Sequence, residues 1–120
     1  MLAYCRFKGI GVIPWGPLNA GLLTRPVEKS KDTERGSGIP TPLSEADKAI
    51  ISRVEEVAKK YGKSMTQVAL AWVKAKVTSP IVGTSSLERL AENVDLDLVL
   101  TAEDEKYLEE PCVSLLNITL

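Results

Sequence analysis

The sequence contains no histidine, and this absence excludes more chemistry than any other feature of its composition. Histidine is the commonest general acid or base in enzymes, and the Ser-His-Asp and Cys-His systems of hydrolases require it. It is also the most frequent side-chain ligand of transition metals. By itself the chain therefore cannot supply the reacting groups of most hydrolases or zinc enzymes.

Cysteines are few and neither sign of charge is in excess. Cys5 and Cys112 lie near opposite ends without metal-ligand spacing, which predicts two reduced thiols in a cytoplasmic protein. Fifteen Lys and Arg residues against 16 Asp and Glu residues give a net charge of -1. This balance does not indicate nucleic acid or an anionic membrane as a partner. No apolar run approaches the roughly 20 residues that span a bilayer, and the N-terminus lacks the apolar stretch of a signal peptide.

What is present predicts one soluble globular domain. The 120 residues are 44% hydrophobic and 26% charged, an ordinary globular composition. Apolar spacing, capping hydroxyls and stop signals predict the end of a helix over residues 1–8 and four further helices. We expect these four to begin at Ser44, at Ser64, at Ser85 and at Thr101, and to end at Gly62, near Lys76, near Asp95 and before Pro111.

Two short apolar runs, residues 10–15 and 78–83, are bounded by glycine and proline. Such runs are typical of parallel strands that are buried on both faces. Strands separated by helices predict a parallel β/α arrangement. The irregular segment 16–41 is too long for a plain connection, so we expect either a mobile loop over a site or a disordered excursion.

The first predicted strand ends at Trp15 and is followed by Gly16 and Gly21. In parallel β/α folds, ligands bind at the carboxyl ends of strands. An indole at such an end can stack on a flat ligand ring, and glycines allow the backbone to approach a phosphate. An aromatic residue before a Gly-Pro turn is also a common packing feature, so both interpretations stay open.

The second predicted strand ends at Gly83, which permits a tight turn into the next helix. The hydroxyls of Thr84 and Ser85 would lie beside free N–H groups at the helix N-terminus, an arrangement that binds anions. Arg89, one turn later, could bind a phosphate, and Asn93 on the same face could pair with an adenine edge. The alternative is an ordinary capped helix with a solvated arginine.

In order and separation, these segments resemble the aldo-keto reductases, and within them the fungal aryl-alcohol dehydrogenase-like members. Residues 9–26 resemble the seventh barrel strand and its loop, 64–73 the helix before the last strand, 79–93 the eighth strand and cofactor-binding helix, and 100–111 the closing segment. The resemblance implies an α/β fold, a partial (β/α)8 TIM barrel containing the last two strands with their helices. It covers residues 1–111 and leaves 112–120 as an atypical tail.

The resemblance also implies an NADP site. The residue that would stack on the nicotinamide is Trp15, and the pyrophosphate would lie along Gly16, Pro17, Leu18, Ala20 and Gly21. The 2′-phosphate would be held by Thr84, Ser85 and Arg89, with Glu92 and Asn93 near the adenine. Gly16 stands where the family usually has serine, so one side-chain contact is lost. Gly83 stands where some relatives carry lysine, which leaves Arg89 as the main cation and favours NADP over NAD.

No residue receives a catalytic role, because the aspartate, tyrosine, lysine and histidine of the family come from earlier strands. We therefore expect a fragment of an NADP-dependent reductase that interconverts carbonyls and alcohols, with the chain alone inactive. Met1 falls within a family helix, which suggests a truncated gene product or a natural fragment. The alternatives are a non-catalytic fragment that binds a nucleotide or a partner, self-association through exposed strand edges, and a product without independent function.

Overall fold

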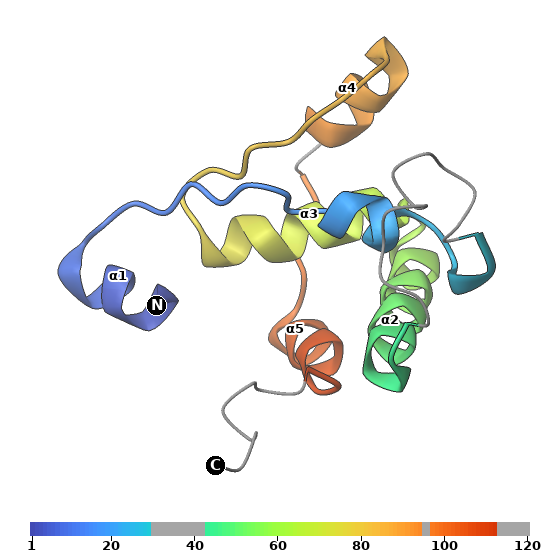
Figure 1. Ribbon diagram of the computed structural model, residues 1–120, viewed down its shortest axis with the longest axis horizontal. Helices are drawn as coiled ribbons and strands as arrows, with labels where there is room; N and C mark the ends of the chain where they lie inside the picture. The colour runs from blue at the N-terminus through green and yellow to red at the C-terminus, as the bar shows by residue number, and fades with distance from the viewer. Residues whose placement is uncertain (30–42, 95–96, 113–120) are drawn as a thin grey trace.

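A computed structural model describes residues 1–29, 43–94 and 97–112, and the helices α2 (Glu45–Tyr61) and α3 (Met65–Lys76) form its centre. Figure 1 shows α5 (Ala102–Glu109) beside this pair, while α1 (Leu2–Lys8) and α4 (Leu87–Val94) lie at the periphery. The chain between α1 and α2 contains two short 3₁₀ helices, η1 (Asn19–Thr24) and η2 (Val27–Lys29).

The expected helix starts and ends are confirmed for the central pair. The Ser44 hydroxyl accepts the Asp47 N–H at 3.1 Å, and the Asp47 carboxylate accepts the Ser44 N–H at 3.0 Å. Ser64 and Gln67 form the same reciprocal capping box before α3. Gly62 ends α2 with φ 61°, a left-handed conformation that costs glycine least.

α3 is the most deeply buried helix of the described chain. Its buried residues, among them Leu70 and Ala71, do not lie on a single face, because α2, η1 and α4 contact α3 from several sides. Trp72 is only half-buried. The core also takes side chains from η1, from the segment before α5 and from α5 itself. Its buried members are Leu22, Ile51, Val54, Val57, Ala58, Met65, Val68, Ala71, Leu98, Leu100 and Leu108.

The two predicted strands are not confirmed as strands. Within the described residues, the two segments meet in one isolated parallel bridge, between Trp15 and Ile81. The Ile81 N–H donates to the Pro14 carbonyl at 2.9 Å, and the Ser79 N–H donates to the Val12 carbonyl at 3.3 Å. The next ladder bond in this register would be donated by the backbone nitrogen of residue 14. Proline has no N–H there, so the pairing stops after one bridge.

The expectation that both faces of these segments are buried is wrong in this structure. Val12 and Pro14 are half-buried, whereas the alternate residues Ile13 and Trp15 are 64% and 87% exposed. Alternation with period two shows that the backbone is extended, with only one side facing the helices. The opposite side has no covering element among the described residues, which explains the exposure.

The segment expected to be irregular, 16–41, contains short helices within its described part, residues 16–29. Residues 19–29 form η1 and η2, and the buried Leu22 anchors η1 to the core. Residues 30–42 and the proposed tail from 113 onward lie outside the described residues, so the expectations for them remain untested.

Candidate functional site

The turn after Trp15 contains a run of left-handed backbone. Gly16 has φ 69°, and Asn19, Ala20 and Gly21 follow with φ 48°, 54° and 90°. For residues with a Cβ, this conformation costs roughly 1–2 kcal/mol each. Asn19 and Ala20 therefore hold conformations that the surrounding structure must impose, a condition that clusters at binding sites.

Hydrogen bonds and one buried side chain impose this conformation. The N–H groups of Asn19 and Gly21 donate to the carbonyls of Gly16 and Leu18, each at 3.0 Å. The Thr24 hydroxyl donates to the Gly21 carbonyl at 2.8 Å. With Leu22 buried below it, the turn is fixed at both ends.

This backbone can bind an anion. Leu18, at φ -101° and ψ 10°, is near the right-handed region, and Asn19 directly after it is left-handed. A right-handed residue followed by a left-handed one turns successive N–H groups toward the same side, which makes a concavity for anions. Because the Asn19 and Gly21 N–H groups already donate to carbonyls, the N–H groups left for an anion are those of Leu18 and Ala20. The predicted phosphate-binding residues Gly16, Pro17, Leu18, Ala20 and Gly21 belong to this turn.

Trp15 lies at the start of the turn with its ring free. At 87% exposed, the indole packs against little of the described chain, which argues against the packing interpretation. Its bridge to Ile81 also places it beside the segment that leads to Gly83. The structure thus brings together the starts of the two predicted site segments.

The second segment is built differently from the sequence prediction in one respect. The hydroxyl that caps α4 is that of Ser86, which accepts the Arg89 N–H at 3.2 Å. The Ser85 hydroxyl accepts instead from Nη1 of the Arg89 guanidinium at 3.0 Å. The Thr84 hydroxyl donates to the Ser86 carbonyl at 3.0 Å. Both serines fit the spacing rule for a cap, so the sequence alone could not distinguish them.

A carboxylate already occupies the N-terminus of α4. The pKa of Glu88 is lowered because its carboxylate accepts from its own backbone N–H and then from the Ser86 hydroxyl. The sequence prediction of free N–H groups at this helix end is therefore only partly met. An anion at this end would depend on the Arg89 side chain more than on the helix terminus.

The remaining predicted residues of this segment are accessible to differing degrees. Gly83, Thr84, Ser85 and Arg89 are exposed, and no atom lies within 4 Å of a Cβ built on Gly83. Glu92 and Asn93, both on the second turn of α4, are half-buried. The segment presents its cation and hydroxyls to solvent, as a surface phosphate site requires.

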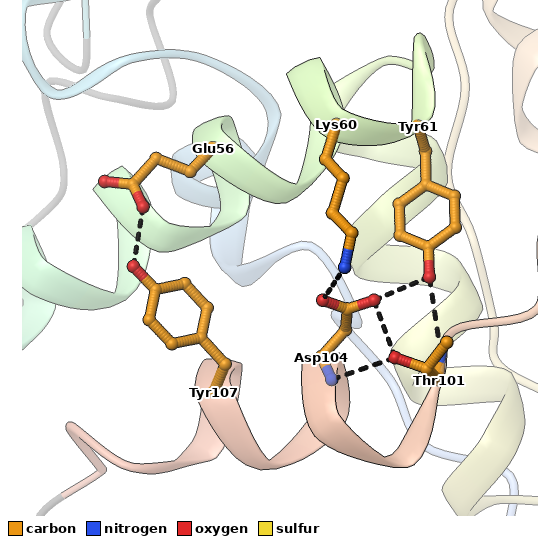
Figure 2. Close-up of polar contacts among 6 residues, drawn as sticks. All are labelled: Glu56, Lys60, Tyr61, Thr101, Asp104 and Tyr107. Carbon is orange, nitrogen blue, oxygen red and sulfur yellow. Dashed lines mark hydrogen bonds and ion pairs between the residues drawn. The ribbon is translucent and has the colours of Figure 1, made fainter.

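The sequence did not single out Asp104 on α5, a carboxylate whose pKa is strongly lowered. Figure 2 shows the Asp104 carboxylate accepting hydrogen bonds from Lys60, Tyr61 and Thr101. Its pKa falls from 3.8 to about 2 because Lys60 donates a hydrogen bond to the charged form, followed by Tyr61 and Thr101. Asp104 is buried, so this network fixes α5 on the last turn of α2.

The Asp104 network has a structural role. Both carboxylate oxygens of Asp104 already accept hydrogen bonds, and the Thr101 hydroxyl caps α5 by accepting the Asp104 N–H at 3.2 Å. Beside it, the Tyr107 hydroxyl donates to Glu56 at 2.6 Å, and this bond raises the pKa of Tyr107 (Figure 2). These groups are satisfied by one another, so they are not arranged to take a ligand.

Two further kinds of feature were sought across the described part of the chain. It contains no group of three or more Cys, Asp or Glu residues that could hold a metal ion. None of its helices is both long and apolar enough to cross a membrane.

Comparison with known sequences gives a consistent result. The sequence model of the Aldo/keto reductase family matches residues 1–111. A Schizosaccharomyces pombe protein that carries the name aryl-alcohol dehydrogenase is 47% identical over 116 residues, which cover 92% of this chain and 33% of the relative. The versiconal hemiacetal acetate reductase of Aspergillus parasiticus is 44% identical over 121 residues, covering 94% of this chain and 35% of the relative. The chain thus spans about a third of the length of these relatives.

Solved structures agree. The Bombyx mori aldo-keto reductase, determined in complex with NADP, matches with a TM-score of 0.63 at 27% identity, covering 92% of this chain and 31% of that one. The glycerol dehydrogenase of Gluconobacter oxydans matches with a TM-score of 0.70 at 23% identity, over 92% of this chain and 36% of that one, and shows the shared fold alone.

Proposed function

Because the chain belongs to the Aldo/keto reductase family, we propose that it forms the cofactor-binding part of an NADP-dependent reductase of carbonyl compounds. The observation that carries this proposal is the Trp15–Ile81 bridge. It places an exposed indole and an anion-binding turn beside the segment that presents the Arg89 guanidinium. One ring-stacking surface and two phosphate-binding elements are the parts that a phosphorylated dinucleotide needs.

The residues present fit such a cofactor. Trp15 would stack on the nicotinamide, and the backbone N–H groups of Leu18 and Ala20 would bind the pyrophosphate. Arg89, oriented by the Ser85 hydroxyl at 3.0 Å, would hold the 2′-phosphate together with Thr84. Glu92 and Asn93, half-buried one turn further along α4, would lie near the adenine.

When bound, a nicotinamide cofactor supplies hydride to a carbonyl carbon or accepts it from an alcohol. This chain's own residues would bind and orient the cofactor. We assign none of them to proton transfer, since the chain contains no histidine and its tyrosines Tyr4, Tyr61 and Tyr107 all lie on α1, α2 and α5. In the complete enzyme, a (β/α)8 barrel would supply the reacting groups from its other strands.

The proposal separates binding from turnover, and both can be measured on the 120-residue chain. We expect NADPH to bind in equilibrium dialysis, and NADPH with an aromatic aldehyde to show no loss of nicotinamide absorbance above the rate without protein. Absence of binding would contradict the proposed cofactor site. Clear turnover would contradict the assignment of the catalytic groups to other strands.

A second candidate function, self-association, is favoured by the exposed apolar side chains. Ile13 and Trp15 on one segment and Ile81 on the other are 64%, 87% and 52% exposed. Size-exclusion chromatography with light scattering tests this candidate: a monomer at all concentrations would eliminate it. A dimer that Ile13→Ser dissociates would support it.

A further inference from the structure

A cation outside the predicted site lies against the anion-binding turn. The half-buried Arg25 directs Nη2 to the Thr24 hydroxyl at 3.3 Å, and that hydroxyl donates to the Gly21 carbonyl at 2.8 Å. A Cβ built on Gly21 would lie 3.3 Å from the same Nη2. The guanidinium therefore rests on the face of Gly21, at the end of the left-handed run.

Arg25 differs from the cations of the helical core in what holds it. On α2 and α3, Arg53, Lys60 and Lys76 each pair with a carboxylate of α5 or of its C-cap residue Glu110, at 2.6–2.7 Å. No carboxylate within residues 1–29, 43–94 and 97–112 forms an ion pair with Arg25 or with Arg89. Each of these two arginines is held by a neutral hydroxyl instead, Arg25 by Thr24 and Arg89 by Ser85.

This difference bears on function. When a guanidinium pairs with a carboxylate, its positive charge is already compensated. A guanidinium oriented by a neutral hydroxyl keeps an uncompensated charge, which can attract an incoming anion. The two hydroxyl-held arginines lie on the two segments that the Trp15–Ile81 bridge brings together.

We infer that Arg25 is a binding residue for the pyrophosphate of the dinucleotide, with Thr24 as the positioning residue that holds its guanidinium against the turn. This inference rests on the proposed function. It adds that the two segments each supply one arginine, and that the two arginines bind different phosphates of the dinucleotide. Arg25 acts on the phosphates common to NADPH and NADH. Arg89 acts on the 2′-phosphate, which only NADPH carries.

Because the two arginines are assigned to different phosphates, their loss should affect NADPH and NADH differently, and this difference can be measured. Dissociation constants for NADPH and NADH are measured on the full chain and on Arg25→Gln, Arg89→Gln and Arg6→Gln. Arg6, exposed on α1, serves as the matched control for loss of one positive charge. We expect Arg25→Gln to weaken both nucleotides by the same factor, roughly tenfold, as for a lost charged hydrogen bond. Arg89→Gln should weaken NADPH roughly tenfold and NADH by less than about twofold. Arg6→Gln should change neither.

Further measurements distinguish a lost phosphate contact from misfolding, and the role of Arg25 from the cofactor site as a whole. Arg25→Lys keeps the charge and should recover part of the affinity, and inorganic pyrophosphate should compete with NADH on the wild-type chain more strongly than on Arg25→Gln. Unchanged affinities in Arg25→Gln, or a loss confined to NADPH, would overturn the role of Arg25 while leaving the cofactor site standing. A wild-type chain that binds neither nucleotide would overturn the proposed function itself.

Discussion

The Lys60 ammonium lies 2.7 Å from the buried carboxylate of Asp104 and joins the last turn of α2 to the first turn of α5. The two ends of this pair are unequal, since the Lys60 side chain is 58% exposed and that of Asp104 is 8% exposed. Losing the buried partner should therefore matter more than losing the exposed one.

We expect Asp104→Asn to lower the free energy of unfolding by about 2 kcal/mol, because a buried charge-assisted network is lost. Lys60→Met should lower the free energy of unfolding less than Asp104→Asn does, since Asp104 keeps its hydrogen bonds from Tyr61 and Thr101. Urea unfolding followed by circular dichroism measures both. The matched control is Glu103→Gln, an exposed carboxylate on the same helix. Equal costs for Asp104→Asn and Glu103→Gln would contradict this account.

The same carboxylate predicts a pH dependence. The pKa of Asp104 is lowered from 3.8 to about 2 in the folded chain. The unfolded chain therefore binds the proton more readily, and the stabilisation is complete above about pH 5 and lost as the pH falls toward 2. Unfolding titrations between pH 5 and 2 should show a shallower loss of stability in Asp104→Asn than in the wild type. Identical pH profiles would show that Asp104 is not the titrating group.

Replacing Pro14 should lengthen the pairing between the two extended segments. Pro14→Val restores an N–H opposite the Ser79 carbonyl, where the ladder now stops. We expect the amide of residue 14 to be protected from hydrogen exchange in NMR spectra. The control is Pro17→Val, which lies beyond the bridge and should not lengthen it. Rapid exchange at residue 14 would mean that proline does not limit the pairing, and that the lack of neighbouring strands among the described residues does.

Trp15 should report cofactor binding without contributing to stability. Because its ring is 87% exposed, Trp15→Phe should change the free energy of unfolding by no more than about 0.5 kcal/mol. NADPH should quench the emission of the wild-type chain, and this quenching should be largely lost in Trp15→Phe. Trp72, half-buried and bonded to Glu109, is the reference fluorophore that remains. Full quenching in Trp15→Phe would place the nicotinamide elsewhere.

Glu88 should oppose the 2′-phosphate at the N-terminus of α4. Glu88→Gln removes this negative charge, so we expect NADPH to bind roughly three- to fivefold more tightly. NADH, which lacks the 2′-phosphate, should gain less. Glu45→Gln, an exposed carboxylate in the first turn of α2, is the control. An equal gain for both nucleotides would contradict the placement of the 2′-phosphate at α4.

The helices could be predicted from the sequence because their signals are local. Ser64 with Gln67 satisfies both partners of the capping box within one turn, and Gly62 ends α2 wherever the rest of the chain lies. The choice between Ser85 and Ser86 as the cap of α4 could not be made, because both hydroxyls meet the same spacing rule and the Arg89 side chain decides between them.

The strands and part of the site could not be predicted, because they depend on distant partners. The apolar run that ends at Trp15 forms a full strand only if neighbours lie on both sides, and Pro14 removes a donor that the second segment would need. Arg25 gave no signal in the sequence, since its relation to Gly21 arises from the left-handed run. The hydrogen-bond network of the buried Asp104 likewise could not be predicted, because its partners Lys60 and Tyr61 lie more than 40 residues away in the sequence.

The pairing around the Trp15–Ile81 bridge has a consequence for the order of folding. It includes a bond from the Val12 N–H to the Thr78 hydroxyl, between residues 66 positions apart, whereas α2 and α3 are neighbours in the sequence. Closing a long chain segment costs more entropy than packing adjacent helices, so we expect the helix pair to form first and the bridge later. The nucleotide site would then be assembled last, on a scaffold that already exists, and a chain arrested before that step would be helical and unable to bind.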